Sequence, residues 1–124
     1  MRPLTDLVDA IRKLGANYPD AIYEESDGTC SYSQGNVVDG PDQQIGCIVG
    51  QAAASIGVPY EVLVDGGEEG SDVFIDRLIN EGLIKPDSYD NGKAHWINSV
   101  QGSQDGGTEW GEAIRQADTW SGVE

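Results

Sequence analysis

One cysteine, one histidine and a nearby carboxylate or amide could together perform nucleophilic catalysis. Cys47 lies at the start of a predicted helix, where unpaired backbone N–H groups favour a thiolate. His95 would then act as the base, and Asp105 or Asn98 would orient it. However, His95 is the only histidine of the chain, and nothing in the spacing directs it toward Cys47. Because a cysteine more often packs as a small buried residue, we assign no catalytic residue and keep Cys47 and His95 only as candidates.

The sequence lacks the residue spacings that metal and cofactor sites require. Two cysteines and one histidine without a C-x-x-C motif do not form a tetrahedral site, and residues 65–69 do not match an EF-hand loop. The glycines never follow the G-x-x-x-x-G-K spacing of a phosphate-binding loop. Cys30 and Cys47 could pair, but the cytoplasmic location expected below argues against a disulfide. We therefore expect no metal and no cofactor.

Two glutamines interrupt the apolar face of a predicted helix over residues 93–104. Ile97, Val100, Gln101 and Gln104 follow the i, i+3, i+4, i+7 spacing that places them on one face. A buried amide without partners costs about 1–3 kcal/mol, so these glutamines must be fully hydrogen-bonded, must line a wet cleft, or must face solvent. A hydrogen-bonded network would join this helix to the hairpin loop or to the helix that starts near Gly46.

The wet cleft is the alternative with a functional meaning. It would be a small-molecule pocket in which amide groups form hydrogen bonds with the ligand and one tryptophan stacks against it. Its residues would be Gln101, Gln104, Asp105 and Cys47, with Trp96 or Trp110 as the stacking tryptophan.

The negative charge of the chain is concentrated in its middle. The 124 residues carry a formal charge of −15, yet no Lys or Arg occurs between residues 14 and 76. Such a charge opposes binding to nucleic-acid phosphates and to anionic membranes. It favours a basic protein partner, although mimicry of DNA phosphates or simple solubility would also explain it. The acidic face expected to contact the partner is formed by Asp65, Glu68, Glu69 and Asp72.

The apolar periodicity predicts about five helices. They are expected over residues 4–14 with Gly15 as the stop, 45–56 closed by Gly57, 71–82 with Ser71 as N-cap, 93–104, and a last helix capped by Thr108. Residues 60–64 favour a helical turn. The small residues Gly46, Gly50 and Ala54 would let another backbone approach the second helix, which we therefore place at the centre.

A short β-hairpin is expected before that central helix. Residues 23–26 and 29–32 are two short runs around Asp27 and Gly28, a pair that is typical of a tight two-residue turn. Residues 35–44 are expected to be a loop. The predicted fold is therefore a single compact domain over residues 1–124, mainly α with one short hairpin; an α+β fold is the alternative.

Three motifs together resemble those of a group of small proteins of actinobacteria and their phages, to which no activity is assigned. They are C-x-Y at residues 30–32, G-C-I-V-G-Q-A at 46–52 and Q-x-x-Q-D-x-G-x-x-W-G-x-A at 101–113. The similarity extends over roughly residues 30–117. It implies a compact domain in which Cys47, Gln101, Gln104 and Asp105 matter, and an accessory role for a phage protein that engages a host factor. It assigns no catalytic residue.

The sequence thus supports a non-catalytic binding protein whose acidic face meets a basic host protein. A small-molecule or cysteine-dependent pocket is the second hypothesis. A subunit of a homo-oligomer is the third, because Ile, Leu, Val and Phe make up only about a fifth of the chain and the core is thin. No long apolar run or signal peptide is present, so we expect a cytoplasmic protein that does not contact membranes.

Overall fold

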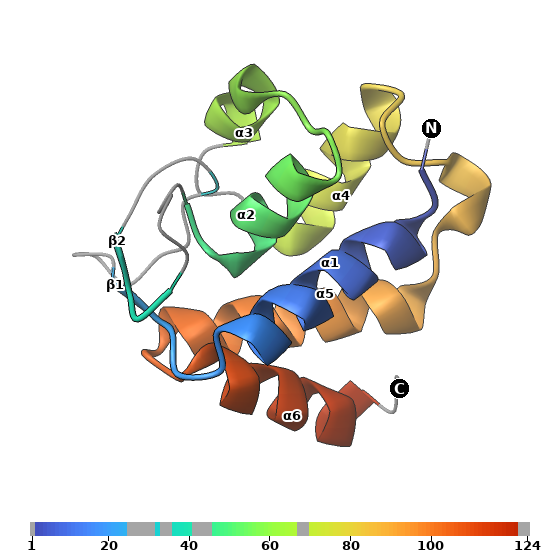
Figure 1. Cartoon of the computed structure of the whole chain (residues 1–124). Helices are drawn as coiled ribbons and strands as arrows, with labels where there is room; N and C mark the ends of the chain where they lie inside the picture. Colours follow the sequence, from blue (N-terminus) through green and yellow to red (C-terminus); the bar gives the residue numbers. More distant parts are fainter. Residues whose placement is uncertain (1, 25–31, 33–35, 41–45, 67–69, 122–124) are drawn as a thin grey trace.

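A computed structural model of the chain describes residues 2–24, 32, 36–40, 46–66 and 70–121. These residues form α-helices, one short 3₁₀ helix (η1) and a two-stranded antiparallel hairpin, which confirms the predicted mainly α fold (Figure 1). The elements are α1 (Leu4–Asn17), β1 (Ile22–Glu24), β2 (Asn36–Val38), α2 (Ile48–Ser55), α3 (Tyr60–Gly66), α4 (Ser71–Asn80), η1 (Pro86–Ser88), α5 (Asn91–Asp105) and α6 (Trp110–Ser121).

Helix α5 lies at the centre of the helix packing. It contacts α1, α2, α4, α6 and strand β1, and Figure 1 shows α1 crossing in front of it. Helices α5 and α6 form an antiparallel pair joined by a short turn. Helix α2 is also central, as expected, because every residue from Ile48 to Ala53 is buried. The core therefore lies where α1, α2, α4 and α6 meet α5.

Helix α1 continues beyond the glycine that was expected to end it. The helix extends to Asn17, and Gly15 is a buried residue of its last turn. A Cβ atom at Gly15 would lie only 2.1 Å from Cδ1 of Ile114 on α6. The glycine leaves room for the side chain of Ile114 where the two helices pack and does not act as a stop signal, so this expectation was wrong.

Helix α2 begins at Ile48 with Cys47 as its N-cap residue, and it ends before Gly57, as predicted. Gly57 has a φ of +98°, a conformation that glycine adopts without strain. Of the small residues expected to admit another backbone, Gly50 does so. A Cβ atom there would lie 2.2 Å from the carbonyl oxygen of Tyr32. Gly46 precedes the helix and Ala54 is exposed.

The hairpin exists, but its second strand is not the one that the sequence suggested. Strand β1 pairs with β2 in antiparallel register, with Tyr23 opposite Val37. β2 lies in the segment expected to be a loop, whereas the Asp27–Gly28 turn and residues 29–31 of the predicted second run lie outside the described residues. Burial explains the choice, because Tyr23 and Val37 are 3% and 1% exposed and both join the core. Tyr32 also enters the core, outside any strand.

Helices α3 and α4 differ from the expectation at their ends. α3 is helical, as favoured, and extends to Gly66, two residues beyond the predicted turn. α4 has Gly70 as its N-cap, so the prediction of Ser71 as N-cap was wrong. The first backbone N–H of α4 is bound by a side chain from α5, which the next section describes.

Candidate functional site

Gln101 on α5 binds the N-terminus of α4. Its Oε1 accepts a hydrogen bond from the backbone N–H of Ser71 at 3.0 Å, and its Nε2 donates to the hydroxyl of Tyr32 at 2.8 Å. The residue is only 5% exposed. The ring of Tyr32 stacks on Phe74, with centroids 3.9 Å apart and planes inclined by 10°. Gln101 therefore satisfies an otherwise unpaired helix N–H and fixes Tyr32 against α4.

Gln104, one turn further along α5, acts in the same way on α2. Its Oε1 accepts a hydrogen bond from the backbone N–H of Ile48, the first residue of that helix, at 3.4 Å. Its Nε2 donates to Oδ1 of Asp105. Gln104 is fully buried. The two glutamines thus join α5 to the starts of α4 and α2. They form a hydrogen-bonded network, which is one of the alternatives predicted for the polar residues on this helix face.

Two further amides, Gln51 and Asn98, bind groups near the starts of α2 and α4. Gln51 on α2 donates from Nε2 to the carbonyl of Gly46 at 3.0 Å, and Asn98 on α5 accepts from the hydroxyl of Ser71 at 3.1 Å. We call Tyr32, Gln101, Gln104 and the N-termini that they bind the amide network. Its oxygens and nitrogens are engaged with protein groups, so it offers a ligand little hydrogen-bonding capacity.

Cys47 is fully buried at the N-cap of α2, and its sulfur is in a disulfide bond. The only other cysteine of the chain, Cys30, lies outside the described residues. A disulfide sulfur is not a thiolate, so Cys47 is no nucleophile in this structure. The expectation that the cysteines would not pair is not met.

His95 lies far from Cys47 along α5. Gln104 contacts the residue after Cys47, and His95 precedes Gln104 by nine positions, or about 14 Å of helix. His95 is exposed and lines a shallow hollow of about 250 Å³ together with Asp72 and Tyr89. The structure therefore does not bring the cysteine–histidine pair together.

The two tryptophans expected to form a stacking wall have structural positions instead. Trp96 is fully buried, and its Nε1 donates to Oδ1 of Asp118 on α6 at 2.8 Å. Arg12 on α1 binds Asp118 through two hydrogen bonds of 2.7 and 3.1 Å, and its guanidinium carbon lies 4.6 Å from the centroid of Trp96. We call these three residues the charged cluster. Trp110 is also fully buried, and its Nε1 has no hydrogen-bond partner among the described residues.

The charged cluster changes the ionisation of its carboxylate. Burial by itself raises the pKa of Asp118, but the hydrogen bonds from Arg12 and Trp96 and the charge of Arg12 outweigh burial. The pKa of Asp118 is therefore lowered below its ordinary value of 3.8. The carboxylate is charged at neutral pH and joins three helices at the surface.

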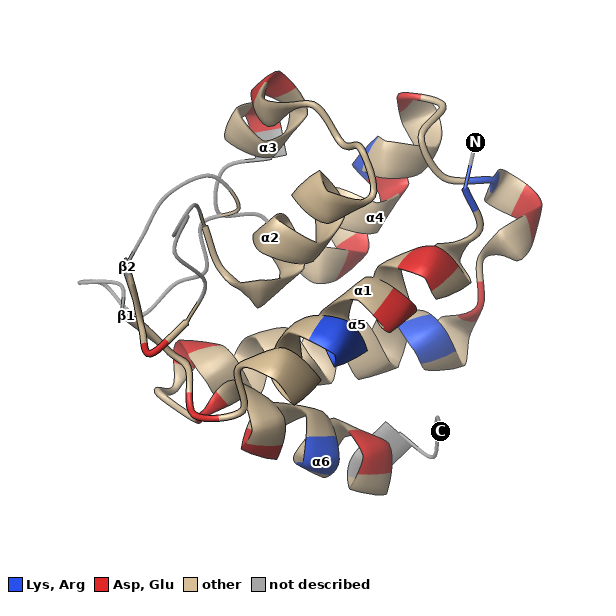
Figure 2. Ribbon diagram, in the orientation of Figure 1, with Lys and Arg blue, Asp and Glu red and all other residues tan. Residues whose placement is uncertain are grey.

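Two of the four residues expected to form the acidic face can be placed. Asp65 on α3 and Asp72 on α4 are both exposed, whereas Glu68 and Glu69 lie outside the described residues. Figure 2 shows acidic positions on both helices. Three of the large apolar side chains that are exposed in the structure lie on the same two helices: Tyr60, Val64 and Val73.

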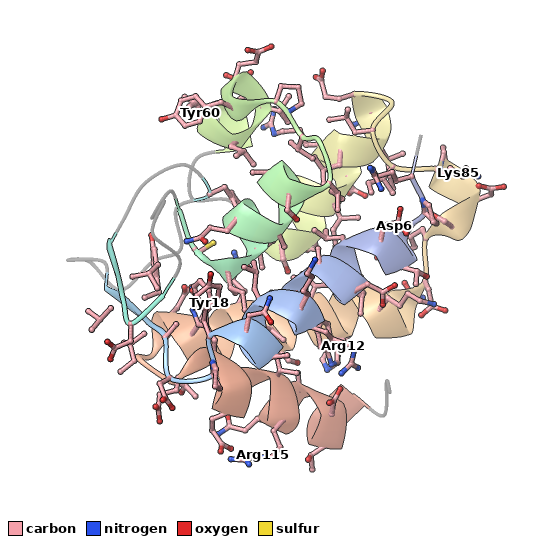
Figure 3. All side chains as sticks on the ribbon, in the orientation of Figure 1. Asp6, Arg12, Tyr18, Tyr60, Lys85 and Arg115 are labelled. Atoms are coloured by element: carbon pink, nitrogen blue, oxygen red, sulfur yellow. The ribbon has the colours of Figure 1, made fainter. Side chains whose placement is uncertain are left out.

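The sequence did not reveal a groove between α1 and α2. It has a volume of about 530 Å³, the largest among those described. Asp6 and Tyr18, labelled in Figure 3, mark its two ends along α1. The sequence feature that could have indicated this groove is Gln51, because the other residues of α2 are small or apolar.

No helix in the described part of the chain has the length and apolarity needed to cross a bilayer. The described residues also contain no group of three or more His, Cys, Asp or Glu side chains placed to hold a metal ion. In comparisons with known proteins, the chain matches no protein-family model, no curated protein and no solved structure.

Proposed function

We propose that the protein is a non-catalytic binding protein that engages a basic protein through the outer faces of α3 and α4. The observation that carries the proposal is the mixture of exposed apolar and acidic side chains on these helices. Tyr60, Val64 and Val73 are 55%, 47% and 48% exposed. Together with four exposed acids they form what we call the acidic surface: Tyr60, Glu61, Val64, Asp65, Asp72, Val73 and Asp76.

The carboxylates of the acidic surface are available to a partner. Within the described residues, none of its four acids forms an ion pair. The cation of α4, Arg77, is half-buried and already engaged elsewhere. Exposed tyrosine and valine supply the apolar contact that interfaces need at their centre, and free carboxylates supply charge complementarity at the rim.

This chemistry selects the class of partner. A partner rich in Lys and Arg gains attraction from the surface, whereas a nucleic acid is repelled by it. A second copy of the chain would place like charges opposite each other in a two-fold interface, so the homo-oligomer hypothesis gains no support from this surface. The resemblance to proteins of actinobacteria and their phages leads us to propose a host protein as this partner.

The experiment is capture of the partner from an actinobacterial lysate with two matched variants. The first replaces the four acids of the acidic surface by amides: Glu61→Gln, Asp65→Asn, Asp72→Asn and Asp76→Asn. The second makes four equivalent changes at exposed acids elsewhere: Asp20→Asn, Asp39→Asn, Asp87→Asn and Glu109→Gln. Both variants lose the same charge, so only the position of the change differs.

We expect the first variant to lose the captured protein and the second to retain it. Capture by the unmodified protein should weaken steeply as the salt concentration rises from about 0.05 to about 0.5 M, because exposed charges are screened. Equal loss with both variants would show that only total charge matters and would refute a defined binding surface. Capture that ignores salt would refute the electrostatic mechanism.

The cytoplasmic location belongs to this proposal as well. Cytosolic reductants keep most thiols reduced, so a cytoplasmic protein should contain Cys47 as a thiol. Blocking thiols at the moment of cell lysis and measuring the mass of the protein distinguishes the two states. A disulfide in that sample would indicate an oxidising compartment instead.

A further inference from the structure

We propose that the groove between α1 and α2 binds a small zwitterionic ligand of the amino-acid class that has an apolar side chain. This proposal is independent of the acidic surface. The groove is formed by one face of α1 and the C-terminal half of α2, and its volume of about 530 Å³ is in the range of ligand sites. It is lined by Arg2, Asp6, Asp9, Ala10, Lys13, Leu14, Asn17, Tyr18, Gln51, Ser55 and Ile56.

Gln51 is a built hydrogen-bonding group in the wall of the groove. Its side chain belongs to a residue that is only 9% exposed, and its Nε2 is fixed by the carbonyl of Gly46 at 3.0 Å. The orientation of the amide is therefore set, and its Oε1 accepts no hydrogen bond from the described residues. This oxygen is not among the enclosed side-chain atoms that lack a hydrogen-bond partner, so it is open to the groove. A ligand N–H group in the groove would satisfy it.

One unpaired charge of each sign lies on the opposite wall. Asp9 and Lys13 are four residues apart on α1, so they project from the same side of the helix. Neither forms an ion pair within the described residues. By contrast, Arg2 and Asp6 at the end of the groove bind each other at 3.1 Å. The groove thus offers one carboxylate and one ammonium group to a ligand.

Part of the remaining wall is apolar. Ala10 and Leu14 on α1 and Ile56 after α2 are half-buried, and Tyr18 is half-buried at one end. A side chain of the size of leucine or phenylalanine would cover these atoms and gain hydrophobic stabilisation. The ligand ammonium would bind Asp9 and Oε1 of Gln51, and its carboxylate would bind Lys13. A ligand with only one of these charges would leave one protein charge unpaired.

The experiment is calorimetric titration of the full chain with L-leucine and L-phenylalanine as probes. Three related compounds serve as comparisons: glycine lacks the apolar side chain, phenethylamine lacks the carboxylate, and N-acetyl-L-phenylalanine lacks the ammonium group. We expect at least one of the two probes to bind at concentrations up to about 10 mM and each comparison compound to bind about tenfold more weakly. No binding of either probe would overturn the proposal, and so would equal binding of the comparison compounds.

Two variants of exposed residues test the geometry without disturbing the core. Asp9→Asn and Lys13→Met should each weaken probe binding about tenfold, because each removes one charged hydrogen bond. Asp87→Asn and Lys85→Met are the matched controls, since both residues are exposed and lie outside the groove. Binding that survives the groove variants unchanged, or falls equally with the controls, would place the ligand elsewhere and overturn the proposal.

Discussion

The amide network and the charged cluster both join helices through polar side chains, but they do so in opposite environments. Gln101 and Gln104 are buried, are neutral and bind backbone N–H groups at helix N-termini. Arg12 and Asp118 carry charge and remain 27% and 34% exposed. A buried hydrogen-bonding group is expensive to leave unpaired, whereas water replaces much of what a half-exposed ion pair contributes. The comparison indicates that the neutral network, more than the charges, fixes the arrangement of the helices.

Replacing Gln101 by leucine should have the largest effect on stability. Leucine has a similar size but no polar atoms, so the N–H of Ser71 and the hydroxyl of Tyr32 both lose their partner. We expect the free energy of unfolding to fall by about 2–3 kcal/mol. Chemical denaturation followed by fluorescence measures it. Gln116→Leu on α6 is the control, because that glutamine is only half-buried and should lose less than about 1 kcal/mol. An equal loss of unfolding free energy in both variants would mean that the burial of Gln101 does not make its hydrogen bonds more important than those of Gln116.

Replacing Gly50 by alanine tests the packing around Tyr32. The new Cβ atom would lie 2.2 Å from the carbonyl oxygen and 2.7 Å from the Cα of Tyr32, and the clash involves backbone that has little room to move. We expect a loss of about 2 kcal/mol despite the better helix propensity of alanine. Gly102→Ala on α5 is the matched control. No heavy atom lies within 4 Å of its new Cβ, so it should stabilise the protein by about 0.5–1 kcal/mol. A stable Gly50→Ala protein would show that Tyr32 is not held tightly.

Replacing Asp118 by asparagine should have the smallest of the three effects. The variant loses the charge that binds Arg12 but retains an acceptor for Nε1 of Trp96. We expect a loss of about 1 kcal/mol at neutral pH. Since folding lowers the pKa of Asp118 below 3.8, its contribution is present at higher pH and disappears as the pH falls through the folded-state pKa.

The pH dependence separates charge from packing at this site. Thermal unfolding of both proteins should show a constant difference between about pH 5 and about pH 7 that shrinks below about pH 4. Asp87→Asn, which removes an exposed carboxylate outside the charged cluster, is the control. A difference that persists in acid would mean that the carboxylate contributes through shape and hydrogen bonding alone.

The helices were predictable because their apolar spacing directly reports which face is buried. The C-terminal end of α2 was predicted from Gly57, because the backbone preference of a glycine does not depend on a partner elsewhere in the chain. Gly15 shows the limit of that reasoning. A glycine that ends a helix and a glycine that admits a neighbouring helix look the same in sequence, and only Ile114 on α6 distinguishes them.

The sequence also located the polar interruption at Gln101 and Gln104 without deciding its role. That decision depended on which groups lay opposite, and these are the N-termini of α2 and α4, which are 56 and 30 residues away along the chain. The hairpin was predicted correctly, but the strand that pairs with β1 was missed for a related reason. Turn chemistry favoured residues 29–32, but burial of Val37 against the core determined the strand that pairs with β1.

The amino-acid sequence alone therefore determined the helical class, the uneven distribution of charge and the positions where polar residues enter an apolar face. Tertiary structure decided what those polar residues bind, that His95 and Cys47 lie apart, and that a groove opens between α1 and α2. The physical reason is the distance along the chain over which each interaction acts. Helix periodicity, capping and charge act within a few residues, whereas a hydrogen-bond partner, a close backbone contact or a cavity wall comes from segments that only folding brings together.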